Sequence, residues 1–374
     1  MSVSTTLYDN SDFELATDIW NATLQNIVTR QPALANFAYR KYHLYNMFFQ
    51  NAHKVKGGDY LEGHITLDSE GNARLVGIWE QDTLVKKNIQ KVYRAYWRQA
   101  KGGMLWNLME TSLNSGEQKI YDTLESQYRS AVKDIIDAVY LSMLTGPTSA
   151  TDDESPNSIN TWLRIGTASS TGGWTGYQSR YNDGSEPGTA YDTAGLTSSA
   201  SVNPGWASYY ADHLGNIDES LLSLLDTAVR KLGFQAPIVP IDPSQGNKGL
   251  VDFSMYTTDN VLKKLNTFYA KADDNMGYNR DSHWGTPTFM SIPFAYCDIL
   301  DTARTSLYGT DPIFGLNHNE IYPIIHQDWN FKTLQTQDPN RAVVLQKLMY
   351  LRYQMLANNP HEAGFLVSQH PDND

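Results

Sequence analysis

The sequence of 374 residues predicts an α+β protein with one unusually long helix, an extended hairpin and a mixed lobe. Apolar residues recur every three or four positions between Ser115 and Pro147, which is the spacing of one helical face. Around the turn-forming segment 68–72, apolar and polar residues alternate as they do in strands. Helical and strand patterns then follow one another between residues 216 and 327. Together these patterns indicate the α+β class.

The first part of the chain predicts short helices followed by a hairpin. Residues 13–53 carry apolar clusters without a strong period, so we expect short helical pieces in this segment. The hairpin spans Lys56–Trp97, where "GGDYLEGHITL" and "ARLVGIWEQD" flank the turn segment "DSEGN". We expect this hairpin to be extended and half exposed.

A basic segment, "TLVKKNIQKVYRAYWRQAKGGM", follows the alternating pattern. It contains no acidic residue, and its basic residues are Lys86, Lys87, Lys91, Arg94, Arg98 and Lys101. Two hypotheses remain open for it. It is either the solvated face of a strand or a basic strip that meets an acidic patch on another copy of the chain.

The long helix has a predicted start, a predicted end and two different faces. Ser115 can cap its N-terminus, with Gln118 completing a capping box, and Gly146 and Pro147 terminate it. At about 1.5 Å per residue it is on the order of 45 Å long, so we refer to it as the rod. Its apolar face consists of Ile120, Leu124, Tyr128, Val132, Ile135, Val139 and Met143. Its polar face includes Glu117, Glu125, Arg129 and Lys133. An ordinary long core helix would show the same pattern.

The second half of the chain predicts a mixed α/β lobe. Residues 148–208 are rich in Gly, Ser, Thr, Asn and Asp, which indicates loops at the surface. Helical spacing returns at 216–232 and 258–269, and strand patterns occur at 236–242, 287–297 and 319–327. The last segment, 340–367, is so apolar that it could form a helix or a long buried strand.

Composition excludes several classes of protein. A net charge of −12 argues against a general nucleic-acid binder, which needs Lys and Arg to neutralise phosphates. The one cysteine, Cys297, excludes intrachain disulfides, and its neighbours "IPFAY" predict a buried, unreactive thiol. The N-terminal segment lacks a signal-peptide pattern, and no apolar run reaches transmembrane length, so we expect a cytoplasmic origin and no membrane partner.

No catalytic or metal-binding arrangement stands out. The histidines are scattered, and the glycine-containing stretches at 172–176 and 244–249 lack nucleotide-binding spacing. The acidic pairs Asp152–Asp153 and Asp273–Asp274 lie in polar loops rather than in a glycosidase arrangement. Trp162, Trp174 and Trp206 could stack on sugars, but packing between subunits explains them more simply. We therefore expect no enzyme, no cofactor and no metal.

Three stretches together resemble the major capsid proteins of tailed phages, the Hong Kong ninety-seven capsid fold that encapsulins share. Residues 55–84 resemble the extended loop of that family, the rod resembles its spine helix, and residues 315–367 resemble its closing strands. The resemblance implies a phage major capsid fold whose peripheral domain joins a long spine helix to β-strands and whose axial domain is mixed α/β. Its parts are an N-terminal arm at 1–54, an extended β-hairpin loop at 55–98, a peripheral domain with the spine helix at 99–146, an axial domain at 147–320 with a loop-rich insertion at 148–208, and C-terminal peripheral strands at 321–374.

The resemblance also implies a function and contact residues. Copies would form hexamers and pentamers of an icosahedral shell around packaged DNA, assembled in the host cytoplasm with a portal, a separate scaffolding protein and, optionally, a decoration protein. Inter-subunit contacts in the extended loop would come from Tyr60, Glu62, His64, Arg74, Trp79 and Glu80. The basic strip, Lys86, Lys87, Lys91, Arg94 and Arg98, would meet acids such as Glu62 or Asp328 of a neighbour. A peripheral loop with Asp328, Lys332, Asp338 and Arg341 would lie near a three-fold contact.

Two other hypotheses remain. An encapsulin-like nanocompartment would use the same fold to enclose a cargo enzyme instead of DNA. A carbohydrate-active enzyme, ranked last, would account for the aromatic loops and the carboxylates, and it would form a small oligomer rather than a shell.

Overall fold

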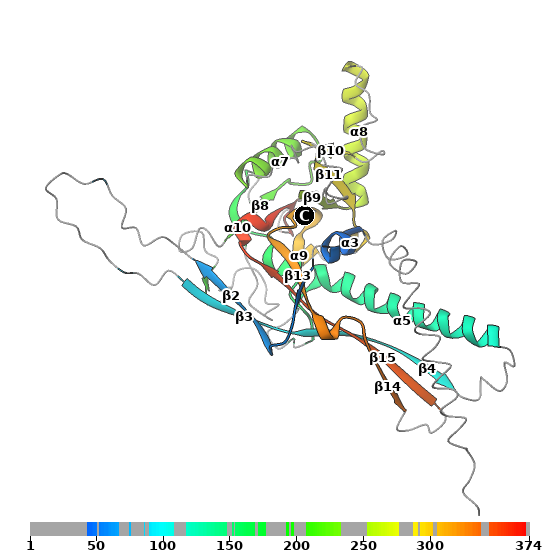
Figure 1. The fold of residues 1–374 in the computed structure, drawn as a ribbon. Coiled ribbons are helices and arrows are strands. Elements are labelled where there is room, and N and C mark those ends of the chain that lie inside the picture. The colour runs from blue at the N-terminus through cyan, green and yellow to red at the C-terminus, as the bar shows by residue number, and fades with distance from the viewer. Residues whose placement is uncertain are drawn as a thin grey trace, which may run out of the picture.

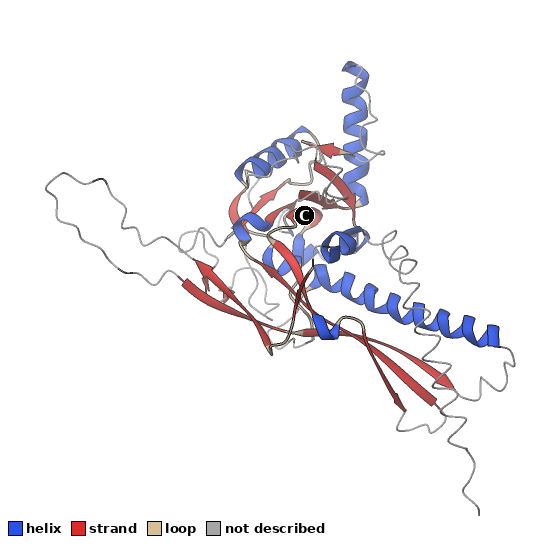
Figure 2. Ribbon diagram, viewed as in Figure 1, coloured by secondary structure: helices blue, strands red, loops and turns tan. Residues whose placement is uncertain are grey.

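A computed structural model gives the fold. It describes residues 43–50, 52–66, 75, 86, 90–107, 117–147, 152, 154–168, 171–176, 192–193, 196–197, 207–232, 253–276, 287–290, 292–301, 305–337 and 344–371. Two sheets, a hairpin and a long helix dominate this part of the chain (Figure 1). Helices occur together with sheets that are largely antiparallel, in keeping with the α+β prediction (Figure 2).

A five-stranded sheet, which we call the long sheet, supports the rod. Its order is β1-β13-β15-β14, and β4 pairs with the other side of β15. The bounds are β1 His53–Val55, β4 Arg98–Asn107, β13 Ile321–His326, β14 Lys332–Gln337 and β15 Val344–Ala357. β15 has 14 residues and pairs with all the other strands except β1. The apolar segment near the C-terminus is therefore a long strand, which periodicity alone left undecided.

The second sheet has seven strands and forms the mixed lobe. Its order is β10-β11-β9-β12-β16-β8-β5. The strands are β5 Gly173–Gly176, β8 Ser208–Asp212, β9 Phe253–Thr257, β10 Thr288–Phe289, β11 Ile292–Tyr296, β12 Thr310–Asn317 and β16 Gly364–Gln369. We expected all of 321–374 to belong with the rod, but β16 lies in this second sheet, between β12 and β8. The chain returns to the lobe through the short helix α10, Pro360–Ala363.

Helices cover the seven-stranded sheet. α7, Glu219–Lys231, buries Leu221 and Leu225 in the lobe core, and Asp218 caps its N-terminus. α8, Asp259–Met276, buries Val261 and Leu265 in the same core. Both helices lie where helical spacing predicted them. The remaining short elements are β6 Asp192–Thr193, β7 Leu196–Thr197, η3 Asp298–Asp301, α9 Thr305–Tyr308 and η4 Gln327–Trp329. The strand pattern at 236–242 lies outside the described residues.

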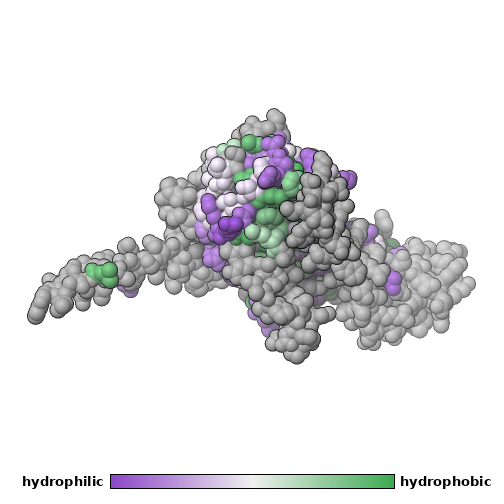
Figure 3. Space-filling view, turned by 90° about the horizontal axis from the view of Figure 1, so that it is seen from above, coloured by the Kyte–Doolittle hydropathy of each residue, from purple (hydrophilic) through white to green (hydrophobic). Residues whose placement is uncertain are grey.

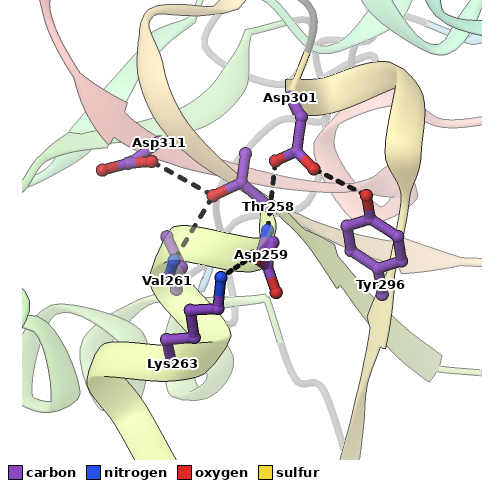
Figure 4. Close-up of polar contacts among 7 residues, drawn as sticks. All are labelled: Thr258, Asp259, Val261, Lys263, Tyr296, Asp301 and Asp311. Carbon is purple, nitrogen blue, oxygen red and sulfur yellow. Dashed lines mark hydrogen bonds and ion pairs between the residues drawn. The ribbon is translucent and has the colours of Figure 1, made fainter.

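A polar network fixes the start of α8 (Figure 4). The Thr258 hydroxyl accepts a hydrogen bond from Val261 N at 3.4 Å and donates one to Asp311 Oδ1 at 3.1 Å. Asp301 accepts from Asp259 N at 3.1 Å and from the Tyr296 hydroxyl at 2.7 Å, and the latter bond raises the pKa of Tyr296 to about 12. The network joins α8 to β11, η3 and β12. It is a helix cap shared by three neighbouring elements.

The rod is α5, Glu117–Thr145, and it lies along one face of the long sheet (Figure 1). Its buried residues include Tyr128, Ile135, Val139 and Met143, which were all predicted on its apolar face. Gly146 follows the helix with φ of 56°, the left-handed conformation of a helix end, so the predicted stop is confirmed. The predicted cap, Ser115, lies outside the described residues.

The C-terminal half of the rod connects the two lobes. The Ser142 hydroxyl shares a hydrogen bond with the Tyr353 hydroxyl of β15. Two residues earlier, the Tyr140 hydroxyl donates to Asp298 Oδ1 at 2.6 Å, in the short helix η3 of the mixed lobe. Tyr140 also lies 3.4 Å from the sulfur of Cys297. One helix therefore contacts both lobes within a single turn.

Two segments are more buried than the sequence suggested. α3, His43–Gln50, places Leu44 and Phe48 in the central core, so this part of the expected arm is integrated into the body. Residues 156–166, inside the segment expected to be surface loop, are also buried, and the helix α6, Ile159–Trp162, lies there. Within this buried polar stretch, Ser158 and Thr161 form a complete capping box, which satisfies polar groups at the start of α6.

Lys347 is the basic residue buried on the side of β15 that faces the rod. Desolvation lowers the pKa of its ammonium group to about 8. Lys347→Met keeps a side chain of similar length that does not titrate, so the stability of the variant should not follow this pKa. Between pH 8 and 10.5 the unfolded wild-type chain binds more protons than the folded one, so the stability of the wild type should rise relative to that of the variant between pH 7 and pH 10, by on the order of 1–2 kcal/mol. Thermal unfolding of both proteins at pH 7 and pH 10 measures this, and an unchanged difference would contradict it.

Candidate inter-subunit surfaces

The hairpin consists of β2, Tyr60–Thr66, and β3, Gln90–Tyr96, paired antiparallel. Among the described elements, these strands have their main contacts with each other (Figure 2). Tyr60 and Tyr96 face each other at its base with ring centroids 6.1 Å apart, and both side chains are exposed. A two-stranded sheet is marginal alone in water, so this hairpin is a candidate for contact with another molecule.

The strand that pairs with β2 differs from the prediction. We expected 73–82 to pair with it around a turn at 68–72, but the described partner is 90–96, within the segment predicted as a separate basic strand. The expected turn lies outside the described residues. Alternation marked several strand-like runs correctly but could not choose between partners, because pairing depends on long-range contacts.

The predicted contact residues of the loop divide into two groups. Tyr60, Glu62 and His64 lie on β2, while Arg74, Trp79 and Glu80 lie outside the described residues. Glu62 occupies the position paired with Arg94 of β3. The register therefore gives Glu62 a basic cross-strand neighbour within its own chain, whereas we expected such a neighbour on another copy.

The structure distributes the predicted basic strip over three places. Lys86 is exposed outside the strands, and Lys87 is outside the described residues. Lys91 and Arg94 belong to β3, and Arg98 begins β4 of the long sheet. The five residues thus do not form one strand face, because the chain passes from the hairpin into the long sheet at Trp97.

Trp97 forms the joint between the hairpin and the body, a role that the sequence did not indicate. Its indole Nε1–H donates to the carbonyl oxygen of Gly58 at 2.9 Å and so links the two legs of the hairpin. Its ring lies edge-on to His326, with centroids 5.2 Å apart. Gly57 and Gly58 both have positive φ, at 81° and 89°, which glycine adopts without strain. These contacts fix the position at which the hairpin leaves the body.

The predicted polar face of the rod and the predicted peripheral loop lie only partly within the described residues. On the rod, Arg129 is exposed and Lys133 is partly buried, whereas the side chains of Glu117 and Glu125 lie outside the description. In the peripheral loop, Asp328 and Lys332 are exposed, and Asp338 and Arg341 are outside the described residues. Asp328 N donates to His326 Nδ1 at 3.2 Å, which forms the tight turn of η4.

Sequence reasoning missed an aromatic and cationic cluster beside that loop. The guanidinium of Arg352 lies 3.9 Å from the ring centroid of Trp329, and Lys332 Nζ lies 4.8 Å from it. Tyr350 packs edge-on against the same tryptophan at 5.9 Å. The four residues of this cluster are Trp329, Lys332, Tyr350 and Arg352. Their proximity can be recognised only when 344–357 is known to be a strand paired with 332–337.

The enzyme-like features of the sequence have structural explanations. Trp162 is fully buried, and Trp174 stacks on His361 of the same chain with centroids 3.4 Å apart. The buried Trp162 ring is therefore not an open sugar platform, whereas Trp174 is half-buried and Trp206 lies outside the described residues. Burial raises the pKa of Cys297 to about 11, as an unreactive thiol requires. Within the described ranges, no group of three or more His, Cys, Asp or Glu could hold a metal ion. None of the described helices combines the length and apolarity needed to cross a membrane.

Comparisons with known proteins identify the fold. A scan against protein-family models finds no match, and a search of curated proteins finds none either. The capsid of cyanophage A-1(L) matches with a TM-score of 0.54 and 11% identity, over 86% of this chain and 90% of that one. Two other structures match with lower TM-scores. The capsid of Myoviridae phage XM1 has a TM-score of 0.47 and 10% identity, over 86% of this chain and 91% of that one. The SrpI encapsulin of Synechococcus elongatus PCC 7942 has a TM-score of 0.47 and 8% identity, over 88% of this chain and 88% of that one.

The likeness to the A-1(L) capsid shows a shared fold, so this chain has the α+β fold of a phage capsid subunit. The resemblance and the fold class predicted from the sequence are confirmed. The described part of this fold includes the hairpin β2–β3, the rod α5, the long sheet and the seven-stranded sheet.

Proposed function

We propose that this chain is the major capsid protein of a tailed double-stranded DNA phage. Many copies would assemble into hexamers and pentamers of an icosahedral shell that encloses the genome in the virion. The observation that carries the proposal is the capsid fold combined with a hairpin whose strands contact mainly each other. In a shell, each hairpin would lie over a neighbouring subunit, which would give its two strands a surface to pack against.

The rod and the interfaces have defined roles in this proposal. The rod stiffens the subunit by bonding to both lobes, so that contacts at distant edges stay in register. Single contacts can be weak, since many act together in a closed shell. Tyr60 and Tyr96 would anchor the hairpin, and Asp328 and Lys332 would meet neighbours near a three-fold contact. A portal, a scaffolding protein and a decoration protein would be further partners. DNA would be held without sequence specificity, in keeping with a net charge of −12.

Purification of the expressed chain followed by electron microscopy tests the proposal. We expect closed shells of hexamers and pentamers, and nucleic acid inside shells formed during infection. Shells that enclose a protein cargo and no nucleic acid would instead indicate an encapsulin-like compartment. A small oligomer with no shell under any assembly condition would refute both shell hypotheses.

The hairpin gives a sharper prediction. Replacing residues 67–89 with an Asn-Gly turn should keep β2 and β3 paired, because Thr66 and Gln90 are register partners. The variant should remain soluble and folded, with a melting temperature within a few degrees of wild type, and should form no shells. Electron microscopy and thermal unfolding measure the two properties. Normal shells from this variant would contradict the role given to the hairpin.

A further inference from the structure

His326 lies where three parts of the subunit meet. It is the last residue of β13, it is the register partner of Val55 in β1, and its side chain caps the turn of η4. Its ring packs edge-on against Trp97, at the point where β3 passes into β4 (Figure 1). The side chain is 7% exposed. A change at His326 therefore affects the long sheet, the peripheral loop and the base of the hairpin together.

The hydrogen bond of His326 defines the charge of its ring. Nδ1 accepts from Asp328 N at 3.2 Å, so this nitrogen carries a lone pair and the ring is neutral, with its proton on Nε2. A backbone N–H group can only donate. A proton added at Nδ1 would therefore set two donors against each other and remove the cap of η4.

The surroundings of His326 also oppose a positive charge. Burial of a charge without a paired acid is unfavourable, so a charged ring should turn toward water. The titratable and charged residues on the elements beside His326 are His43 and Tyr45 of α3, His53, Lys54 and Lys56 at β1, Asp59 at the base of the hairpin, Arg98 of β4, Tyr322 of β13, Asp328 of η4, Lys332 of β14, and Arg352 and Tyr353 of β15. Lysine and arginine outnumber the two acids in this set, so a further positive charge at His326 would be repelled.

Movement of the His326 ring would free Trp97 and, with it, the base of the hairpin. The Trp97 indole holds the other leg of the hairpin through its bond to the carbonyl oxygen of Gly58. Gly57 and Gly58 both have positive φ and no side chain, so the backbone can change direction there at little steric cost. The strands β2 and β3 pair with each other along their whole length, so the hairpin would swing as one unit.

We propose that His326 is an acid-sensitive latch for the hairpin. The neutral ring holds Trp97 against the body, and a proton on His326 releases the base of the hairpin. The latch is a property of the folded subunit. Its consequence for assembly, a weaker hairpin contact between neighbouring subunits in acid, rests on the proposed function.

Hydroxyl-radical footprinting of the full-length protein tests the latch at Trp97. Soluble subunits are isolated by size exclusion and oxidised at pH 8 and pH 5, the interval in which histidine changes its charge. Tandem mass spectrometry measures oxidation at each tryptophan against an added reference peptide. Oxidation of Trp97 should rise about threefold at pH 5, as expected for loss of one capping hydrogen bond. Trp162, which is fully buried, should stay protected at both pH values and so exclude global unfolding.

Two variants at position 326 make the test specific. His326→Phe keeps a ring against Trp97 that cannot be protonated, so oxidation of Trp97 should stay low at both pH values. His326→Asn keeps an acceptor for Asp328 N but does not titrate, so its oxidation level should not depend on pH.

His213 provides the matched control. Its Nδ1 also accepts a backbone N–H, from Gly215 at 3.1 Å, and its side chain is buried as well. It lies in the mixed lobe, whose described surface carries hydrophilic and hydrophobic areas side by side (Figure 3). His213→Asn should therefore keep the wild-type rise at Trp97.

Other outcomes reject the latch. Equal oxidation of wild-type Trp97 at pH 8 and pH 5 would overturn it, as would a rise that persists in His326→Phe or disappears in His213→Asn. A rise that begins only below about pH 4.5 would follow carboxyl groups rather than a histidine and would overturn it too. Because the measurement uses single subunits, a protein that forms no shells would refute the proposed function and leave the result at Trp97 unchanged.

Discussion

Ile135→Asp should prevent folding. Ile135 is 1% exposed in the middle of the rod and packs against the long sheet at Gly102. The substitution removes a buried apolar side chain and places an unpaired carboxylate in its position, which together should cost at least about 4 kcal/mol. That loss is comparable to the whole stability of many domains, about 5–15 kcal/mol. We expect little soluble protein and no cooperative thermal transition by circular dichroism.

A matched control lies three residues away on the same helix. Ala138 is exposed, so Ala138→Asp introduces the same carboxylate on the solvent side of the rod. This variant should fold, with stability within about 1 kcal/mol of wild type. A folded Ile135→Asp protein, or two variants equally destabilised, would refute the orientation of the rod.

Gly102→Val should separate the rod from the sheet. A Cβ at this position would lie 2.6 Å from Ile135 Cγ1 and 2.8 Å from the backbone oxygen of Ala131. Because a backbone oxygen within the rod cannot move aside alone, the whole helix must shift. We expect a loss of about 3 kcal/mol or more, measured as a lower midpoint in urea unfolding.

The next residue provides the comparison. At Gly103 the added Cβ meets only Leu348 Cδ2 within 3.4 Å, at 3.1 Å, on the side of the sheet away from the rod. A leucine methyl group can rotate away, and valine favours a strand, so Gly103→Val should change stability by less than about 1 kcal/mol. Equal losses at positions 102 and 103 would show that the rod does not approach this strand as closely as described.

Local signals were sufficient for the helices and for several strands. The rod, α7 and α8 lie where helical period predicted them, since an amphipathic helix buries one face whatever its partner. β13 and β11 likewise fall within predicted strand runs. The burial of 156–166 was not predictable, because it depends on contacts with distant segments. For example, Asn157 N donates to Gln354 Oε1 at 2.7 Å, across 197 positions.

The contact surfaces were predicted less completely. Composition and the order of segments were sufficient for the resemblance to a capsid subunit, and the fold of the A-1(L) capsid agrees with it. The predicted contact residues remain proposals, and the basic strip is divided between the hairpin and the long sheet. Trp97 and Arg352 could not be singled out, because their roles depend on the partners Gly58 and Trp329, which lie 39 and 23 positions away.

The sequence by itself determined the α+β class, the rod with its buried face and its end at Gly146, and the order of hairpin, rod and mixed lobe. These features depend on periodicity and on local backbone preferences, which act over a few residues. Only the tertiary structure decided that β2 pairs with β3, that 344–357 is a strand and that β16 joins the second sheet. Strand pairing is fixed by contacts between distant segments, and an apolar run fits either a buried helix or a buried strand until its neighbours are in place.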